Sequence, residues 1–325
     1  MKNRTKIMGM PPRLLSHFIL LSLLPLLSAC YQVAPDASQN IAPTQVHIPN
    51  VRPANTVLVD GSAIVAVLLK NEVTGFASFT PGYNVEIGNA GTNDGFTLFC
   101  EDKTDIQMAV RAMSGTEAAA CLRNSLDYLQ LTVAYDVLAV IGDAPLNGCI
   151  SATELTFLYT HDTTKLNWSN VRSGLPSVPI KIFAPSGQTA AAQFFAEQML
   201  QGKQSLVVPD IQGLITGGSG IGYLSFVESR KLNGRLPILA VDSGTGCTMP
   251  SEQTVWDGSY AFLSRPLYLY INRQSARRSE VFRFLSYALS VTGQSRIGNV
   301  GFLAARPKTY ENAQTELDHV NQSKS

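Results

Sequence analysis

Short runs of β-branched and apolar residues alternate along most of the chain with longer stretches that have helical apolar spacing. Such runs predict strands where Gly, Asn, Asp or Ser bound them. The predicted strands cover 57–59, 83–87, 133–141, 180–183, 221–224, 238–241 and 267–271. Three predicted helices cover 63–71, 151–159 and 279–289. Two more begin near 96 and after the loop at 186–189, and the second of these ends near 200. This alternation implies an α/β fold with mostly parallel sheets and helices on both faces.

Three of the predicted strands lead into small, hydroxyl-rich loops that open helices. The first loop covers 60–63, the second 91–95 and the third 186–189. The first N–H groups of a helix lack partners within it and lie at its positive end, so each loop can seat an anion. Because Ser and Thr are also the commonest helix caps, one such loop alone predicts only a cap. Three loops at the carboxyl ends of strands favour a shared ligand.

The N-terminal residues have the pattern of an export signal. A basic start without acidic residues precedes an apolar run at 14–27. This run is shorter than the roughly 20 residues of a membrane-spanning helix, and it ends in small residues, which is typical of a secretory signal peptide. The ending Leu27-Ser28-Ala29-Cys30 resembles the bacterial lipobox. We therefore expect a signal peptide at 1–29 and lipid on Cys30. The alternative is an ordinary signal peptide that contains a cysteine.

The segments that flank the α/β region are polar. Residues 30–53 are rich in Pro, Ala, Gln and Asn and predict a flexible tether behind the lipid. Residues 307–325 predict a polar, frayed tail. Tyr31 replaces the Asp that usually retains lipoproteins in the inner membrane, so the choice between the cell membrane and the outer membrane stays open.

The charge balance of the mature chain excludes one class of partner. The whole chain has 25 Lys and Arg against 24 Asp and Glu. Removing Lys2, Arg4, Lys6 and Arg13 with the signal leaves 21 against 24, a net charge of about −3. A nucleic-acid binder would carry a basic surface, so we expect no nucleic-acid partner. An anionic ligand would need a local site.

Four cysteines remain once Cys30 is assigned to lipid: Cys100, Cys121, Cys149 and Cys247. An even number in an oxidising compartment predicts two disulfides, and three pairings are open. The wide spacings and the scarcity of His argue against a metal site. The chain also lacks a Gly-x-Ser-x-Gly motif and a Walker loop, so we expect neither an enzyme nor a cofactor.

A series of short motifs follows one another in a fixed order from about 57 to 304: Gly61-Ser62-Ala63-Ile64-Val65, Gly91-Thr92-Asn93-Asp94-Gly95, Phe99-Cys100, Asp105-Ile106, Ala109-Val110-Arg111, Glu117, Cys121, Ala134-Tyr135-Asp136, Trp168, Gly187-Gln188-Thr189 and Leu263-Ser264-Arg265-Pro266-Leu267. This order resembles that of the phosphate-binding proteins of ABC transporters, the PstS-like branch of the type II periplasmic-binding-protein fold. The Arg-Pro-Leu segment and the Phe-Cys to Cys spacing are the most specific of these motifs.

The resemblance implies two lobes joined by crossover strands, with 54–133 plus 262–306 in the first lobe and 134–261 in the second. It implies a buried oxyanion, phosphate above all, an ABC transporter permease as partner and a membrane reached through the lipid. It also implies the disulfides Cys100–Cys121 and Cys149–Cys247.

The resemblance carries a ligand set over to this chain. Ser62 and the N–H of Ala63 would serve the first loop, and the Thr92 hydroxyl and the Asn93 N–H the second. Arg111 would be the charged clamp, because a guanidinium fork neutralises and orients an oxyanion. The third loop would supply its donors from Gly187, Gln188 and Thr189. The alternative for Arg111 is a surface salt bridge, and for the hydroxyl residues a capping role.

The chain departs from the family pattern at several ligand positions. Ala63, Ile64 and Val110 replace hydroxyl residues, Gln188 replaces a glycine, and Asp94 brings an acid into the second loop. Each lost charged hydrogen bond is worth roughly 1.5 to 3 kcal/mol. A second hypothesis is therefore a surface lipoprotein that uses this fold for protein or cell-wall contact, with a degenerate ligand site.

Overall fold

The computed structural model describes residues 52–203, 205, 210–217 and 219–322. The predicted signal peptide, Cys30 and nearly all of the predicted tether lie outside these described residues. The end of the tether does not fit the prediction, because Arg52 forms ion pairs with Asp102 at 2.8 Å and Asp105 at 3.3 Å.

The strands are β1 Thr56–Gly61, β2 Asn84–Ile87, β3 Ile106–Ala109, β4 Tyr128–Gly142, β5 Cys149–Ser151, β6 Ile221–Ser225, β7 Ile238–Asp242, β8 Cys247–Thr248, β9 Ser264–Asn272 and β10 Leu303–Ala304. The α-helices are α1 Ala63–Phe79, α2 Thr92–Cys100, α3 Gly115–Arg123, α4 Ala152–Thr160, α5 Trp168–Val171, α6 Ala190–Met199, α7 Ile211–Ile215, α8 Phe226–Lys231, α9 Glu252–Trp256, α10 Ser279–Leu289, α11 Val291–Ile297 and α12 Pro307–Gln322. Short 3-10 helices cover Thr163–Lys165, Ala261–Leu263, Ser275–Arg277 and Gly298–Val300.

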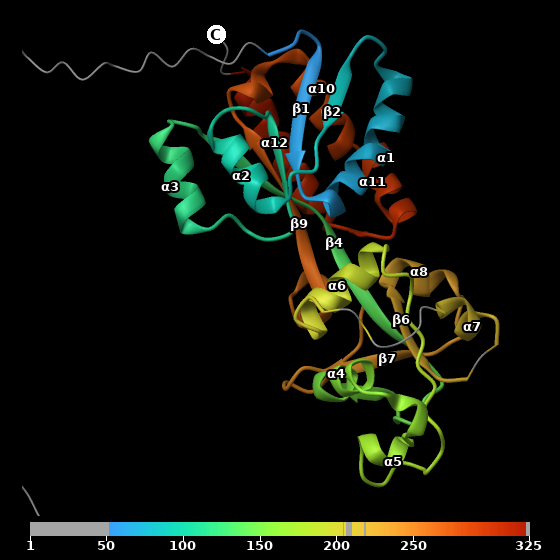
Figure 1. Ribbon diagram of the computed structural model, residues 1–325. Coiled ribbons are helices and arrows are strands. Elements are labelled where there is room, and N and C mark those ends of the chain that lie inside the picture. Colours follow the sequence, from blue (N-terminus) through green and yellow to red (C-terminus); the bar gives the residue numbers. More distant parts are fainter. Residues whose placement is uncertain (1–51, 204, 206–209, 218, 323–325) are drawn as a thin grey trace, which may run out of the picture. The chain divides into compact units, whose positions relative to one another are not determined.

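Two long strands, β4 and β9, connect the two halves of the sheet. They run side by side in Figure 1, with Tyr128 opposite Asn272 at one end of the ladder and Val137 opposite Ser264 at the other. At one end of this ladder, β3, β1 and β2 continue the sheet from β9. At the other end, β4 pairs with β6 and β7, and β7 pairs with β5 and β8.

The first half of the sheet is covered on both faces. Successive residues of a strand point to opposite faces. Leu269 and Ile271 of β9 accordingly join the core formed with α1, α10 and α12. Tyr270, between them, points to the other face and meets Phe96 and Phe99 of α2. The core formed with α1, α10 and α12, called the first core below, draws its buried residues from two separate stretches of the chain, 57–134 and 267–320.

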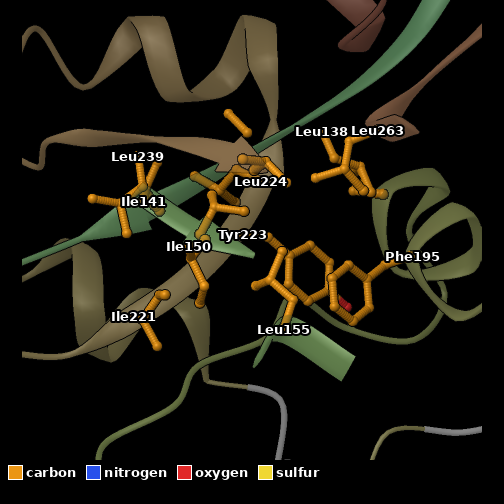
Figure 2. Close-up of a cluster of buried hydrophobic side chains, with 14 of the residues drawn as sticks. Leu138, Ile141, Ile150, Leu155, Phe195, Ile221, Tyr223, Leu224, Leu239 and Leu263 are labelled. Carbon is orange, nitrogen blue, oxygen red and sulfur yellow. The ribbon is translucent and has the colours of Figure 1, made fainter. Parts of the chain in front are cut away.

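The second core is built almost entirely from one continuous stretch, 137–263, with Leu303 as the exception. Aromatic contacts hold α6 against β6, since Phe195 stacks on Tyr223 with 4.0 Å between the ring centres. Figure 2 shows part of this core, with buried side chains from β4, β5, β6, β7, α4 and α6: Leu138, Ile141, Ile150, Leu155, Phe195, Ile221, Tyr223, Leu224 and Leu239.

The disulfide pairing implied by the family resemblance is confirmed. Cys100 bonds to Cys121 and joins α2 to α3. Cys149 bonds to Cys247 and joins β5 to β8. One cross-link therefore joins two helices, and the other joins two strands of the second half of the sheet.

The predicted α/β class and the helices on both faces are confirmed, but the prediction of mostly parallel sheets is wrong. Among the described strands, β1 runs parallel to β2 and β3, and β5 runs parallel to β7. The remaining ladders are antiparallel, and most of them involve β4 or β9. The alternation of strands and helices gives no signal for strand direction where the chain passes back and forth between two cores.

Two local predictions also differ from the structure. The predicted strand at 180–183 makes only an isolated bridge, between Ile182 and Ile221. Pro185 follows shortly after, and proline has no N–H with which to extend a ladder. Helix α2 begins at Thr92 rather than near 96, so the second loop itself forms the first turn of the helix.

The predicted frayed tail is wrong for Pro307–Gln322, which forms helix α12. Tyr310, Leu317 and Val320 are buried on one face of this helix. The Tyr310 hydroxyl donates to the carbonyl of Val133 and accepts from the N–H of Ala305 at 2.9 Å. A narrow apolar stripe in an otherwise polar stretch therefore suffices to dock the helix.

Candidate functional site

The first and second loops lie side by side at the ends of β1 and β2. The N–H of Gly91 donates to the carbonyl of Gly61 at 2.9 Å. Gly61 has φ +124°, and a Cβ there would lie 2.2 Å from the carbonyl oxygen of Met108. A Cβ on Gly95 would lie 2.6 Å from the Cα of Gly61. Glycine at both positions therefore allows α1 and α2 to begin next to each other.

Asp60 organises this junction, although it was not among the candidate residues. Its carboxylate accepts from the N–H of Gly61 at 2.6 Å and from that of Ala90 at 2.8 Å. The same aspartate thus binds the backbone at the start of the first loop and just before the second. Its position directly after a predicted strand was the signal in the sequence.

Ser62 is the N-cap of α1, and its hydroxyl accepts from the N–H of Ile64 at 3.2 Å. Its own N–H donates to Met108 at 2.9 Å, and the residue is buried. Ala63, the first helical residue, is exposed. Because its N–H lies in the first turn, it has no acceptor within the helix. The capping role of Ser62 is therefore present, and the adjacent backbone remains available to a ligand.

The buried side chain of Gln107 holds the backbone of the second loop. The Nε2 of Gln107 donates to the carbonyl of Thr92 at 3.0 Å. The Thr92 hydroxyl accepts from the N–H of Val110 at a long 3.5 Å. Gln107 is fully buried, and its Oε1 has no hydrogen-bond partner in the part of the chain that the structure describes. Asp94 is exposed in the first turn of α2.

Arg111 lies next to the second loop, but its charge is already paired. Its Nη1 and Nη2 donate to the two carboxylate oxygens of Glu117 at 2.8 and 2.7 Å. Nη2 also donates to Oδ1 of Asn93, and the guanidinium lies 5.4 Å from the centre of the Phe96 ring. The hydrogen bond from Arg111 lowers the pKa of Glu117 to about 2. The structure therefore brings Arg111, Asn93 and Thr92 together around an existing salt bridge.

The third loop is exposed and caps α6. The Thr189 hydroxyl accepts from the N–H of Ala192 at 3.2 Å and donates to the carbonyl of Ser186 at 2.9 Å. The N–H of Gln188 donates to the Ser186 hydroxyl at 3.5 Å. Gly187, between these residues, is exposed as well.

A cavity of about 620 Å³ opens beside the third loop. Gln188 and Thr189 line it, as do Val67 of α1, Asp136 of β4 and Phe302. The candidates of the first two loops (Ser62, Ala63, Thr92, Asn93 and Arg111) are not among the residues that line it. The structure thus brings five of the predicted ligand residues to the junction of the first two loops, whereas Gln188 and Thr189 line a separate cavity and Gly187 is exposed in the loop beside it.

An ion pair beside this cavity was not predicted from the sequence. Asp136 and Arg265 are directly opposite in the β4–β9 ladder and are joined at 3.0 Å. Burial raises the pKa of Asp136 to about 6, against the opposing effect of Arg265. Both residues occur in motifs of the family resemblance, but only the strand register shows that they meet.

The described residues contain no cluster of three or more His, Cys, Asp or Glu side chains that could hold a metal ion. None of the helices in the described part of the chain has the length and apolar character needed to cross a membrane.

Comparison with known proteins finds a family match over most of the chain. The family model described as the PBP superfamily domain matches residues 43–292. Protein SphX of Synechococcus elongatus is 32% identical over 268 residues, which cover 78% of this chain and 79% of the relative. The phosphate-binding protein PstS of Staphylococcus haemolyticus is 27% identical over 271 residues, which cover 79% of this chain and 84% of the relative.

Solved structures agree with the fold described above. A possible phosphate binding protein from Planctomyces limnophilus matches with a TM-score of 0.73 and 26% identity, over 82% of this chain and 98% of that one. An ABC-type phosphate transport receptor from Vibrio cholerae matches with a TM-score of 0.57 over 76% of this chain and 99% of that one. At 19% identity, the second likeness concerns the fold alone.

Proposed function

The chain belongs to the family of the PBP superfamily domain, and from this premise we propose that it is a lipid-anchored, extracytoplasmic solute-binding protein that holds phosphate, or a similar oxyanion, for an ABC transporter. The family is a non-enzymatic one, so the chain binds its ligand without converting it. The names of the relatives support phosphate as the ligand.

One observation carries the proposal, namely that α1 and α2 begin side by side. The Gly61–Gly91 hydrogen bond sets the two helix starts next to each other, so both direct free N–H groups to one edge of the sheet. Two positive helix ends together form a better seat for an anion than either alone. We assign Ser62, Ala63, Thr92, Asn93 and Arg111 to this half of the site.

The second half of the proposed site is the third loop, with Gly187, Gln188 and Thr189. An oxyanion has many lone pairs, and each of them needs a donor once water is excluded. The third loop supplies exposed backbone N–H groups and the Gln188 amide, while the Thr189 hydroxyl, which already donates to the carbonyl of Ser186, holds the loop. The proposed lobes are 54–133 plus 262–306 and 134–261, and the division of the buried residues into a core from 57–134 and 267–320 and a core mostly from 137–263 supports two lobes. A hinge motion in β4 and β9 would close them.

The ligand is tested by isothermal titration of the purified mature lipoprotein in mild detergent with phosphate, sulfate and arsenate. We expect phosphate to bind with a dissociation constant in the micromolar range or below, about 8 kcal/mol of binding free energy or more. Absence of heat at millimolar phosphate would contradict the proposal. Thr189→Val should weaken binding, whereas Thr74→Val, on the exposed face of α1, should not.

The anchor is tested separately. We expect Cys30→Ser to abolish incorporation of labelled palmitate and to release the chain from the membrane fraction, while Cys100 and Cys121 remain bonded. A Cys30→Ser chain that still carries lipid would contradict the assignment. Fractionation of inner and outer membranes then shows which of them carries the wild-type chain.

A second candidate function is protein or cell-wall contact by a surface lipoprotein with a degenerate ligand site. The Arg111–Glu117 ion pair favours it, because the proposed clamp already has an anionic partner. For this second function we expect no heat of binding in the titrations with phosphate, sulfate and arsenate. We also expect isolated cell wall to capture the chain. If wall-depleted and wall-intact cells retain equal amounts of the Cys30→Ser chain, this second function is excluded.

A further inference from the structure

Arg265 links three elements, namely its own strand β9, the strand β4 and the helix α6. It lies on β9, directly opposite Asp136 of β4. Its Nε and Nη2 donate to Oδ2 of Asp136 at 3.2 and 3.0 Å, and its Nη1 pairs with Glu197 of α6. Asp136 is 1% exposed, so the pair with β4 is shielded from solvent, whereas Glu197 lies at the surface.

A second contact with α6 comes from an aromatic ring. The guanidinium lies 4.3 Å from the centre of the buried Phe194 ring. Phe194 and Glu197 are three residues apart and therefore share one face of the helix. A flat guanidinium can stack on a ring while its fixed N–H fork donates to two carboxylates, whereas a lysine ammonium is a compact point charge without a planar fork.

Helix α6 is the element that presents the third loop. Thr189 caps it, and the N–H of Ala192 in its first turn donates to the Thr189 hydroxyl. Gln188 and Thr189 line the 620 Å³ cavity together with Asp136, the partner of Arg265. Arg265 is not among the lining residues, so any effect it has on a ligand passes through other groups.

We propose that Arg265 is a positioning residue that fixes α6, and with it the third loop, to the crossover strands β4 and β9 beside the 620 Å³ cavity. The inference rests on the proposed function for its consequence in binding, but the fixing of the loop is a property of the unliganded chain. Glu197 and Phe194 are the contacts on α6, and Asp136 is the fixed point on β4.

The test compares Arg265→Lys and Glu197→Gln with wild type in the purified mature lipoprotein. Backbone hydrogen exchange is measured without ligand in peptides that cover 186–192, with α4 and α10 as internal references. Arg230→Lys is the matched control, because Arg230 also pairs with a glutamate, Glu252, and lies over a phenylalanine ring. Glu197 is 58% exposed, so its replacement leaves the core intact.

We expect exchange at 186–192 to rise about tenfold in both variants, with α4 and α10 unchanged and Arg230→Lys like wild type. Where wild type binds phosphate, we expect the dissociation constant of both variants to rise about tenfold as well. Exchange at 186–192 like that of wild type in both variants would overturn the proposal, and so would an equal rise throughout the chain. Wild type that fails to bind phosphate refutes the proposed function, while the exchange result still decides the role of Arg265.

Discussion

Arg111 and Glu117 form a two-point ion pair at 2.7 and 2.8 Å, and the glutamate also closes the capping box of α3 with Ser114. The pair is partly exposed, since 41% of the Arg111 side chain is accessible. An oxyanion that reaches Arg111 therefore shares the guanidinium with a carboxylate that carries the same sign of charge. The role of Arg111 therefore distinguishes the two candidate functions. As a clamp it supports oxyanion binding, and as a partner of Glu117 alone it supports the surface contact.

Arg111→Met should weaken phosphate binding at least tenfold if Arg111 contacts the ligand, because a charged hydrogen bond is worth about 1.5 to 3 kcal/mol. Titration calorimetry measures the change. Arg230→Met, which removes an exposed arginine from another glutamate pair, serves as the control and should bind as wild type does. Equal affinity of Arg111→Met and wild type would assign Arg111 to the salt bridge alone.

Gly61→Ala should destabilise the chain by about 3 kcal/mol or more, because its φ is positive and a Cβ would meet the Met108 carbonyl. The junction of the first two loops should open as well, with loss of ligand binding. Gly115→Ala is the control, since a Cβ there meets nothing within 4 Å. Chemical unfolding of both variants gives the comparison, and equal unfolding midpoints would contradict the close packing described above.

Glu72 makes stability depend on pH. It is 1% exposed on α1, and neither carboxylate oxygen has a hydrogen-bond partner among the described residues. Burial raises its pKa from 4.5 to about 7, with Arg296 acting in the opposite direction. Because the folded-state pKa is the higher one, the folded chain holds the proton more tightly. Its contribution to stability is complete below about pH 4.5 and is lost as the pH rises through about 7.

Glu72→Gln should therefore be more stable than wild type at pH 8, by on the order of 1–2 kcal/mol, and should lose most of this advantage at pH 4.5. Thermal unfolding from pH 4 to 8 measures the difference. Glu101→Gln, at an exposed site paired with Lys103, should follow the wild-type profile. Parallel profiles for Glu72→Gln and wild type would show that Glu72 does not titrate in this range.

The Cys149–Cys247 bond closes a separation of 98 residues, against 21 for Cys100–Cys121. Because a longer closed loop restricts the unfolded chain more, replacing both cysteines of the long loop with Ser should cost about 4 kcal/mol, and those of the short loop about 3 kcal/mol. Denaturant unfolding under oxidising conditions measures both. The reverse order would indicate that local packing, rather than loop length, governs the two bonds.

Elements whose signals are local could be read from the sequence. Helix α10 has the predicted bounds, Ser279–Leu289, and the helix predicted at 151–159 is α4, Ala152–Thr160, which Ser151 and Glu154 start with a capping box. Helix α3 was missed even though Ser114 and Glu117 have the same Ser-x-x-Glu spacing, which forms the same capping box. That signal was available, because a capping box needs only four consecutive residues.

Features that depend on pairing between distant segments could not be read in this way. Asp136 and Arg265 lie opposite each other only because of the β4–β9 register. The antiparallel ladders on β4 likewise depend on the return of the chain from the second core. In the candidate site, residue types predicted the helix starts, whereas the Arg111–Glu117 pair depends on the turn between β3 and α3, which brings together two residues six positions apart.

The two cores differ in how much of the chain must be present before each of them can form. The second core needs almost nothing beyond 137–263, whereas the first needs both 57–134 and 267–320. A chain that emerges N-terminus first can complete the second core while the first still lacks β9, α10 and α12. Folding order would then run against sequence order, and the first half of the proposed site would be the last part to assemble.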